Sequence, residues 1–188
     1  TPQLPEPFTI EKLVPLMDEA GVDRCVIVPP SWPGDRNDYG LEAARRYPDR
    51  FRVMGRVTLR NPAMAAQLPT WKQQQGMLGI RVTFLANDVG MLTDGTADWF
   101  WPAAEKAGLP VMFFAPGRSS VMAPIAEKHP GLQLIVDHNG VTGVMAKDGT
   151  MDAALAQTIA LAKFPNVSVK LSAWPGASQQ PYPWADVK

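Results

Sequence analysis

The stretch that decides the fold is Leu132-Gln133-Leu134-Ile135-Val136-Asp137-His138-Asn139-Gly140. An apolar run bounded by glycine and proline predicts a short strand enclosed on both faces. The strand ends in polar residues, which are costly to bury without partners, and ligands of parallel α/β proteins bind at the carboxyl ends of strands. We therefore predict that His138 is a catalytic residue; the structural alternative is a histidine that only caps the next turn. Asp137 should point to the opposite face and orient neighbouring backbone.

Short apolar runs alternate with helical patterns along the rest of the chain. Strands are expected at residues 22–28, 51–57, 78–84, 110–114, 132–137 and 167–171, and helices at residues 9–20, 39–47, 62–75, 97–107, 119–128 and 150–163. This alternation predicts parallel strands joined by right-handed crossovers. The loops that follow the strands are long, and no Gly-rich phosphate turn follows the first strand. A third feature is that polar side chains interrupt several strands on one face, which a barrel interior tolerates. The three features favour a (β/α)8 TIM-barrel type over a doubly wound sheet, as one domain over residues 1–188.

Composition narrows the classes of partner. The chain has 188 residues, of which 18 are Lys or Arg and 18 are Asp or Glu. This balance gives no electrostatic signature for nucleic acid or a membrane surface, and no stretch approaches the ~20 apolar residues of a membrane span. The single cysteine, Cys25, excludes an internal disulfide and is typical of a reducing, cytoplasmic compartment. A small-molecule substrate is therefore expected, and a homo-oligomer is left open.

Charged side chains interrupt two of the predicted strands. In residues 79–84 the alternation places Arg81 and Thr83 on one face, opposite the apolar residues. Helices should cover the apolar face, so Arg81 should point into the barrel. A buried guanidinium needs a carboxylate partner or an anionic ligand. Arg81 is therefore predicted either to bind a substrate carboxylate or to form an internal ion pair.

The last predicted strand repeats this pattern. Ser168, Lys170 and Ser172 share one face. Lys170 could orient a substrate or pair with the acid of a neighbouring strand, and Ser172 lies beside it. Trp174 follows in the next loop, where an indole could wall a cyclic ligand or simply pack over the barrel mouth. We predict that Lys170, Ser172 and Trp174 bind substrate together with Arg81.

An ordered set of short segments runs along almost the whole chain. The segments are Asp23-Arg24-Cys25-Val26-Ile27-Val28-Pro29-Pro30-Ser31, Tyr47-Pro48-Asp49-Arg50-Phe51-Arg52, Leu78-Gly79-Ile80-Arg81, Leu109-Pro110-Val111-Met112, Leu134-Ile135-Val136-Asp137-His138-Asn139-Gly140 and Asn166-Val167-Ser168-Val169-Lys170-Leu171-Ser172. In this order they resemble the amidohydrolase-related family (amidohydrolase 2), and within it the lactonase-like branch that includes 2-pyrone-4,6-dicarboxylate lactonase. Another branch holds decarboxylases of the aminocarboxymuconate-semialdehyde and resorcylate type.

The resemblance implies a site built on a (β/α)8 barrel. Family members use a His-x-His on the first strand, a histidine at the end of the sixth and an aspartate on the eighth; many add a histidine on the fifth strand and bind a divalent metal, often zinc. Counted in this way, the chain holds strands two to seven and is expected to be a fragment that lacks the first and eighth. His138 matches the sixth-strand histidine, and would be a metal ligand if a metal is bound. Phe114 or Ala115 stands in the place of the fifth-strand histidine, which weighs against a full metal site and agrees with the lactonase-like branch.

Three functions follow from the resemblance. The first is hydrolysis of a small carboxylated lactone or a similar C–O or C–N bond. In that reaction His138 would polarise the carbonyl or help to activate water, Arg81 would bind substrate carboxylate, and the eighth-strand aspartate would be the base. The second is a metal-dependent decarboxylase on the same barrel. The third is an inactive, truncated barrel with exposed strand edges; the fragment alone is expected to be inactive.

Overall fold

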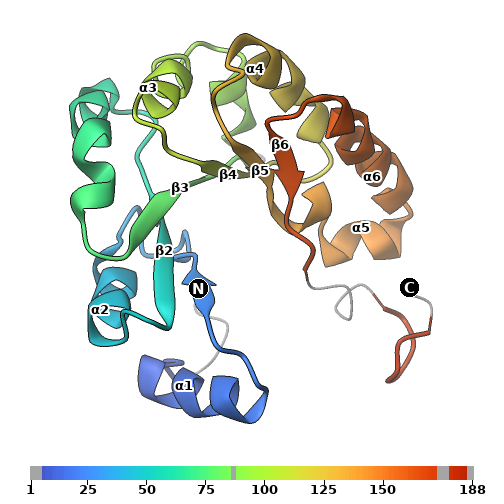
Figure 1. Ribbon diagram of the computed structural model, residues 1–188. Helices are drawn as coiled ribbons and strands as arrows, with labels where there is room; N and C mark the ends of the chain where they lie inside the picture. Colours follow the sequence, from blue (N-terminus) through green and yellow to red (C-terminus); the bar gives the residue numbers. More distant parts are fainter. Residues whose placement is uncertain (1–5, 86–87, 173–177, 186–188) are drawn as a thin grey trace.

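The computed structural model describes residues 6–85, 88–172 and 178–185, and its centre is one parallel sheet of six strands. The strands are β1 (Cys25–Ile27), β2 (Phe51–Arg56), β3 (Met77–Thr83), β4 (Val111–Phe114), β5 (Leu134–Val136) and β6 (Val167–Val169). Each strand pairs in parallel with the strand before it in the chain. A doubly wound sheet would reverse its order at a switch point, whereas this sheet curls in one direction (Figure 1). The predicted class, an incomplete TIM barrel, is confirmed.

The longer helices, among them α2, α3, α4 and α6, lie along the outer side of the curled sheet (Figure 1). The helical segments are α1 (Ile10–Glu19), α2 (Asp38–Arg46), η1 (Pro62–Gln73), η2 (Val89–Leu92), α3 (Phe100–Lys106), η3 (Ser119–Met122), α4 (Ala123–Lys128), η4 (Asp137–Gly140), α5 (Gly143–Asp148), α6 (Met151–Ile159) and η5 (Ala160–Lys163). The segment predicted as a helix at residues 62–75 is a 3-10 helix with Pro69 inside it, because proline lacks the N–H that an α-helix needs. The structure adds η2, η4 and α5, which the sequence pattern did not predict.

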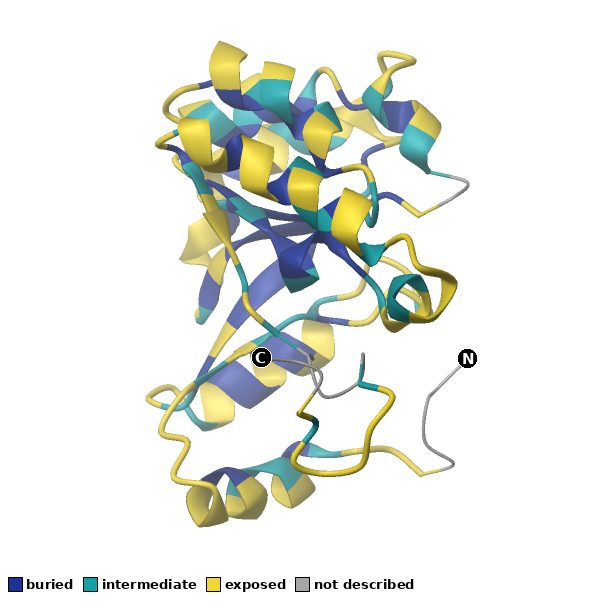
Figure 2. Ribbon diagram, turned by 90° about the vertical axis from the view of Figure 1, so that its right-hand side faces the viewer, coloured by how far each residue is buried: buried dark blue, intermediate teal, exposed yellow. Residues whose placement is uncertain are grey.

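The hydrophobic core fills the layer between the sheet and these helices. Strand residues that face the helices are buried completely, among them Phe51, Val53, Ile80, Val111, Phe113 and Leu134. Figure 2 shows the buried strands inside and the exposed residues on the outer faces of the helices. Burial of apolar surface on this side stabilises the sheet by roughly 25 cal/mol per Å². The opposite, concave side is therefore free to carry polar groups.

Asn166 ties the last two strands to the helix that precedes β5. Its side chain is buried, and its Nδ2 donates to the backbone carbonyls of Ala126, His129 and Leu132 at 3.1, 3.0 and 3.0 Å. The backbone carbonyl of Asn166 accepts from the N–H of Leu134 at 2.8 Å. One amide thus satisfies carbonyls that α4 and its following turn would otherwise bury unpaired.

A left-handed turn follows β5. His138, Asn139 and Gly140 have φ values of 52°, 54° and 73°, a region that costs non-glycine residues roughly 1–2 kcal/mol each. The N–H of Asn139 donates to the carbonyl of Lys170 at 3.2 Å, and its carbonyl accepts from the Thr158 hydroxyl at 2.9 Å. A Cβ on Gly140 would clash with the hydroxyls of Ser119 and Thr158. Packing against η3 and α6 therefore fixes this turn in place.

Within the described ranges, no helix combines the length and the apolar character that crossing a bilayer requires.

We expect Gly140→Ala to lower the free energy of unfolding by about 2–5 kcal/mol, the sum of backbone strain and overpacking. Gly149→Ala is the matched control, because Gly149 has a similar φ of 76° but open space around its Cβ position. The control should lose about 1–2 kcal/mol from strain alone. Urea unfolding followed by circular dichroism measures both. Equal losses in the two variants would mean that the contacts with Ser119 and Thr158 do not constrain the turn.

Candidate functional site

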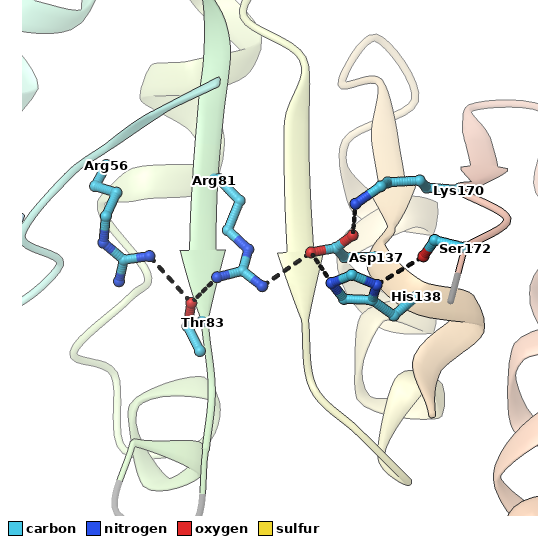
Figure 3. A network of polar contacts seen from close by, with 7 residues as sticks. All are labelled: Arg56, Arg81, Thr83, Asp137, His138, Lys170 and Ser172. Carbon is cyan, nitrogen blue, oxygen red and sulfur yellow. Dashed lines mark hydrogen bonds and ion pairs between the residues drawn. The ribbon is translucent and has the colours of Figure 1, made fainter. Parts of the chain in front are cut away.

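Polar side chains gather on the concave side of the sheet, at the carboxyl ends of β2, β3, β5 and β6. Figure 3 shows the cluster, which consists of Arg56, Arg81, Thr83, Asp137, His138, Lys170 and Ser172. Arg56 and Arg81 are paired neighbours on adjacent strands. Because parallel strands end at the same edge, residues that are far apart in sequence meet here. This is the edge where parallel α/β proteins bind their ligands.

Asp137 is the centre of the cluster. Its carboxylate is 1% exposed and is held by two cations, with Arg81 Nη2 2.9 Å from Oδ2 and Lys170 Nζ 2.8 Å from Oδ1. His138 Nε2 lies 3.4 Å from the same Oδ2. The prediction that Asp137 points away from His138 is wrong. The left-handed backbone of His138 ends the strict alternation of the strand, so both side chains reach the same cluster.

His138 sits between Asp137 and Ser172. Its Nδ1 lies 2.6 Å from Ser172 Oγ, while its Nε2 faces the carboxylate. Phe114 packs edge-on against the imidazole, with the two ring centroids 5.3 Å apart. The Arg81 guanidinium lies 5.3 Å from the centre of the Phe114 ring. The side chain of His138 is 37% exposed. The ring is thus fixed on several sides and still open to a ligand.

A second ion pair adjoins the first. Arg56 Nε lies 3.2 Å from Asp35 Oδ1, and Asp35 also accepts a hydrogen bond from the Thr58 hydroxyl at 2.6 Å. The Thr83 hydroxyl accepts from Nη1 of both Arg56 and Arg81. Asp35 lies in a loop after β1 and was not predicted from the sequence. The buried Arg56 is the residue whose charge requires such an acid.

The surroundings shift the pKa values of the central groups. Burial raises the pKa of Asp137, but the hydrogen bond from Lys170 and the charge of Arg81 outweigh it, so the pKa lies below its ordinary value. Burial lowers the pKa of His138, and the charges of Lys170 and Arg81 lower it further against the opposing effect of Asp137. Burial also lowers the pKa of Arg81, but a guanidinium stays protonated. The site therefore holds an ionised Asp137 and a neutral imidazole at pH 7.

The structure brings four of the five predicted site residues together. Arg81, His138 and Lys170 contact Asp137, and Ser172 contacts His138. Arg81 forms an internal ion pair, one of the two arrangements that its sequence position allowed, and its Nε is buried without a hydrogen-bond partner among the described residues. Trp174 lies outside the described residues.

The described residues do not suit the divalent metal that the family resemblance implies. Within residues 6–85, 88–172 and 178–185, no group of three or more His, Cys, Asp and Glu side chains is arranged to hold a metal ion. Both oxygens of Asp137 are occupied by cationic side chains, and both nitrogens of His138 have partners. Phe114 supplies an aromatic ring and no donor atom.

Solved structures from several bacteria share the fold at low sequence identity. A probable 2-pyrone-4,6-dicarboxylic acid hydrolase from Acinetobacter baumannii, with citric acid bound, is 22% identical; the match covers 96% of this chain and 67% of that one, with a TM-score of 0.77. An amidohydrolase from Burkholderia multivorans with bound zinc is 20% identical (92% and 61% covered, TM-score 0.74). A 5-carboxyvanillate decarboxylase from Novosphingobium aromaticivorans with bound manganese is 20% identical (88% and 65% covered, TM-score 0.61).

The chain thus spans between 61% and 67% of the length of these three structures. No curated protein matches it. A sequence model of one family, described as amidohydrolase, matches residues 1–188. Together with the curled parallel sheet and the polar cluster at its carboxyl edge, this match over the full sequence shows that the chain belongs to the amidohydrolase family.

Proposed function

We propose that this chain belongs to a hydrolase that opens a small carboxylated lactone or a similar C–O or C–N bond. The observation that carries the proposal is the meeting of one partly exposed imidazole and two cationic side chains, those of Arg81 and Lys170, around the buried carboxylate of Asp137. The family is named for hydrolysis, and one structural neighbour is described as a probable hydrolase of a cyclic dicarboxylic acid. A decarboxylase on the same fold is the alternative that product analysis tests.

The charge of the cluster suits an anionic substrate. The cations Arg81 and Lys170 face the single carboxylate of Asp137, which leaves one net positive charge with His138 neutral. The third cation of the cluster, Arg56, is balanced by Asp35. Lys170 is the more accessible of the two cations, with 35% of its side chain exposed against 10% for Arg81. Arg81 retains one buried N–H without a partner, at Nε. In this proposal Lys170 meets the substrate carboxylate first and Arg81 completes its binding.

His138 is the acid–base group of the proposed reaction. A neutral imidazole can donate from one nitrogen and accept at the other, so it can activate a nucleophile and later protonate the leaving oxygen. Asp137 and Phe114 hold the ring in one orientation. The buried carboxylate favours the imidazolium that forms during turnover.

One prediction of the proposed function concerns turnover. The protein encoded by the full reading frame that contains this chain should hydrolyse six-membered lactones bearing a carboxylate. His138→Gln should lower kcat by about 10²–10⁴-fold through loss of acid–base catalysis. Spectrophotometry of ring opening measures the rate, and isotopic carbon dioxide capture detects decarboxylation. Release of carbon dioxide without ring opening would replace the proposal with a lyase, and wild-type kcat in His138→Gln would remove His138 from it.

A second prediction of the proposed function concerns the binding of the substrate carboxylate by Lys170. Lys170→Met should lower kcat/KM for a carboxylated lactone by about 10–100-fold, the equivalent of one charge-assisted hydrogen bond. The same variant should change kcat/KM for the uncharged parent lactone much less. Lys163→Met is the control, because the Lys163 ammonium lies over the ring of Phe164 outside the cluster. Equal losses on charged and uncharged substrates would show that Lys170 does not bind the carboxylate.

A further inference from the structure

The hydroxyl of Thr83 lies between two guanidinium groups on the concave side of the sheet. Its oxygen accepts a hydrogen bond from Nη1 of Arg56 at 3.3 Å and another from Nη1 of Arg81 (Figure 3). A hydroxyl group has two acceptor lone pairs and one hydrogen that it can donate. Both lone pairs of Thr83 are therefore occupied by cations, and only its hydrogen is left for a further partner.

That hydrogen is not used inside the part of the chain that the structure describes. No described group accepts a hydrogen bond from the Thr83 hydroxyl. Other threonine hydroxyls of this region do donate within the protein, Thr58 to Asp35 Oδ2 at 2.6 Å and Thr158 to the carbonyl of Asn139 at 2.9 Å. Because the Thr83 side chain is half-buried, its hydroxyl hydrogen is accessible to a ligand.

The two guanidinium groups that orient the hydroxyl are themselves held in place. The Asn37 side chain accepts from the backbone N–H of Arg56 at 2.7 Å and donates to its carbonyl at 3.0 Å. On the other side, Arg81 Nη2 lies 2.9 Å from Asp137 Oδ2. A guanidinium has donors and no acceptor, and it stays protonated. Thr83 therefore cannot turn its hydrogen toward either arginine, and a ligand meets it as a donor.

Thr83 lies too far from His138 to share one atom of a ligand with it. Thr83 is the register partner of Phe114 on the next strand, and the Phe114 ring packs against the imidazole. Thr83 and His138 thus follow β3 and β5, on either side of β4. Adjacent strands are roughly 4.8 Å apart, so these two strands are separated by roughly 10 Å. A substrate whose reacting carbonyl lies at His138 therefore meets Thr83 with a different group.

We propose that Thr83 is a specificity-determining residue that donates a hydrogen bond to a substrate oxygen remote from the reacting carbonyl. Its doubly occupied oxygen also disfavours an N–H group at the same place, because that donor finds no free lone pair and lies beside two cations. The position of the reacting carbonyl and of the substrate carboxylate rests on the proposed function. The preference for an acceptor over a donor follows from the contacts of Thr83 itself.

The test is calorimetric titration of the protein from the full reading frame with three benzoates, each in its meta and para forms. Acetylbenzoate carries a carbonyl acceptor, isopropenylbenzoate has the same shape without the oxygen, and aminobenzoate carries N–H donors. We expect one acetylbenzoate isomer to bind about 10-fold more tightly than its isopropenyl and amino counterparts, the equivalent of one hydrogen bond.

Three variants assign that preference to the hydroxyl. Thr83→Val should weaken binding of the acetyl ligand by about 10-fold and leave the other two ligands nearly unchanged, whereas Thr83→Ser should keep the wild-type preference. Thr70→Val is the control, because the exposed Thr70 donates to the carbonyl of Gln67 within η1. Each variant is first shown to keep the wild-type thermal transition; if Thr83→Val does not, the wild type and Thr83→Ser still report the preference.

The results separate this inference from the proposed function. Equal affinity of the wild type for the three ligands, or a preference that persists in folded Thr83→Val, would overturn the role of Thr83 and leave the hydrolase proposal standing. A preference that Thr83→Val abolishes, in a protein that opens no lactone, would support Thr83 as the donor and overturn the substrate class. A folded wild type that binds none of the benzoates and opens no carboxylated lactone would contradict both.

Discussion

The buried carboxylate of Asp137 is the constraint on which the rest of the site depends. A carboxylate that is 1% exposed is expensive to ionise unless cations and hydrogen bonds replace its water. Arg81 from β3 and Lys170 from the end of β6 provide that replacement, one on each oxygen. The ion pairs therefore join β3 and β6, which are three positions apart in the sheet, to the end of β5 between them. They also decide which way the His138 ring faces.

The two faces of the sheet have different roles: the convex face forms the hydrophobic core, and the concave face carries the polar cluster. Apolar strand residues pack against the helices on the convex side, where they form the core. The concave side carries Arg56, Arg81, Asp137 and Lys170, which satisfy one another in a network that ends at a partly exposed imidazole. Curvature of the sheet is what brings these side chains within hydrogen-bonding distance. A flat sheet with the same register would hold β3 and β6 too far apart for a shared carboxylate.

The sequence was sufficient for the architecture, because alternation of apolar runs with helical patterns leaves few topologies for parallel strands. It also singled out Arg81, His138, Lys170 and Ser172, since polar residues on one face of a buried strand demand an explanation. It gave the wrong direction for the Asp137 side chain. The rule of alternating faces assumes extended backbone, and no local sequence pattern indicated that His138 adopts a left-handed conformation. It failed also at Asp35, which reaches Arg56 from a loop. Both failures concern positions where tertiary contacts override local geometry.

The claim that Asp137 organises the site is tested most directly by equilibrium urea unfolding at pH 7. Two proteins are compared with the wild type: the single variant Asp137→Asn and the triple variant Asp137→Leu, Arg81→Met, Lys170→Met. Removing one partner of a buried ion pair leaves the others charged and unpaired, so we predict a loss of about 3–5 kcal/mol for the single substitution. The triple variant, which removes the charges together, should regain most of that loss. An Asp137→Asn protein with the unfolding free energy of the wild type would contradict the claim that this carboxylate organises the site.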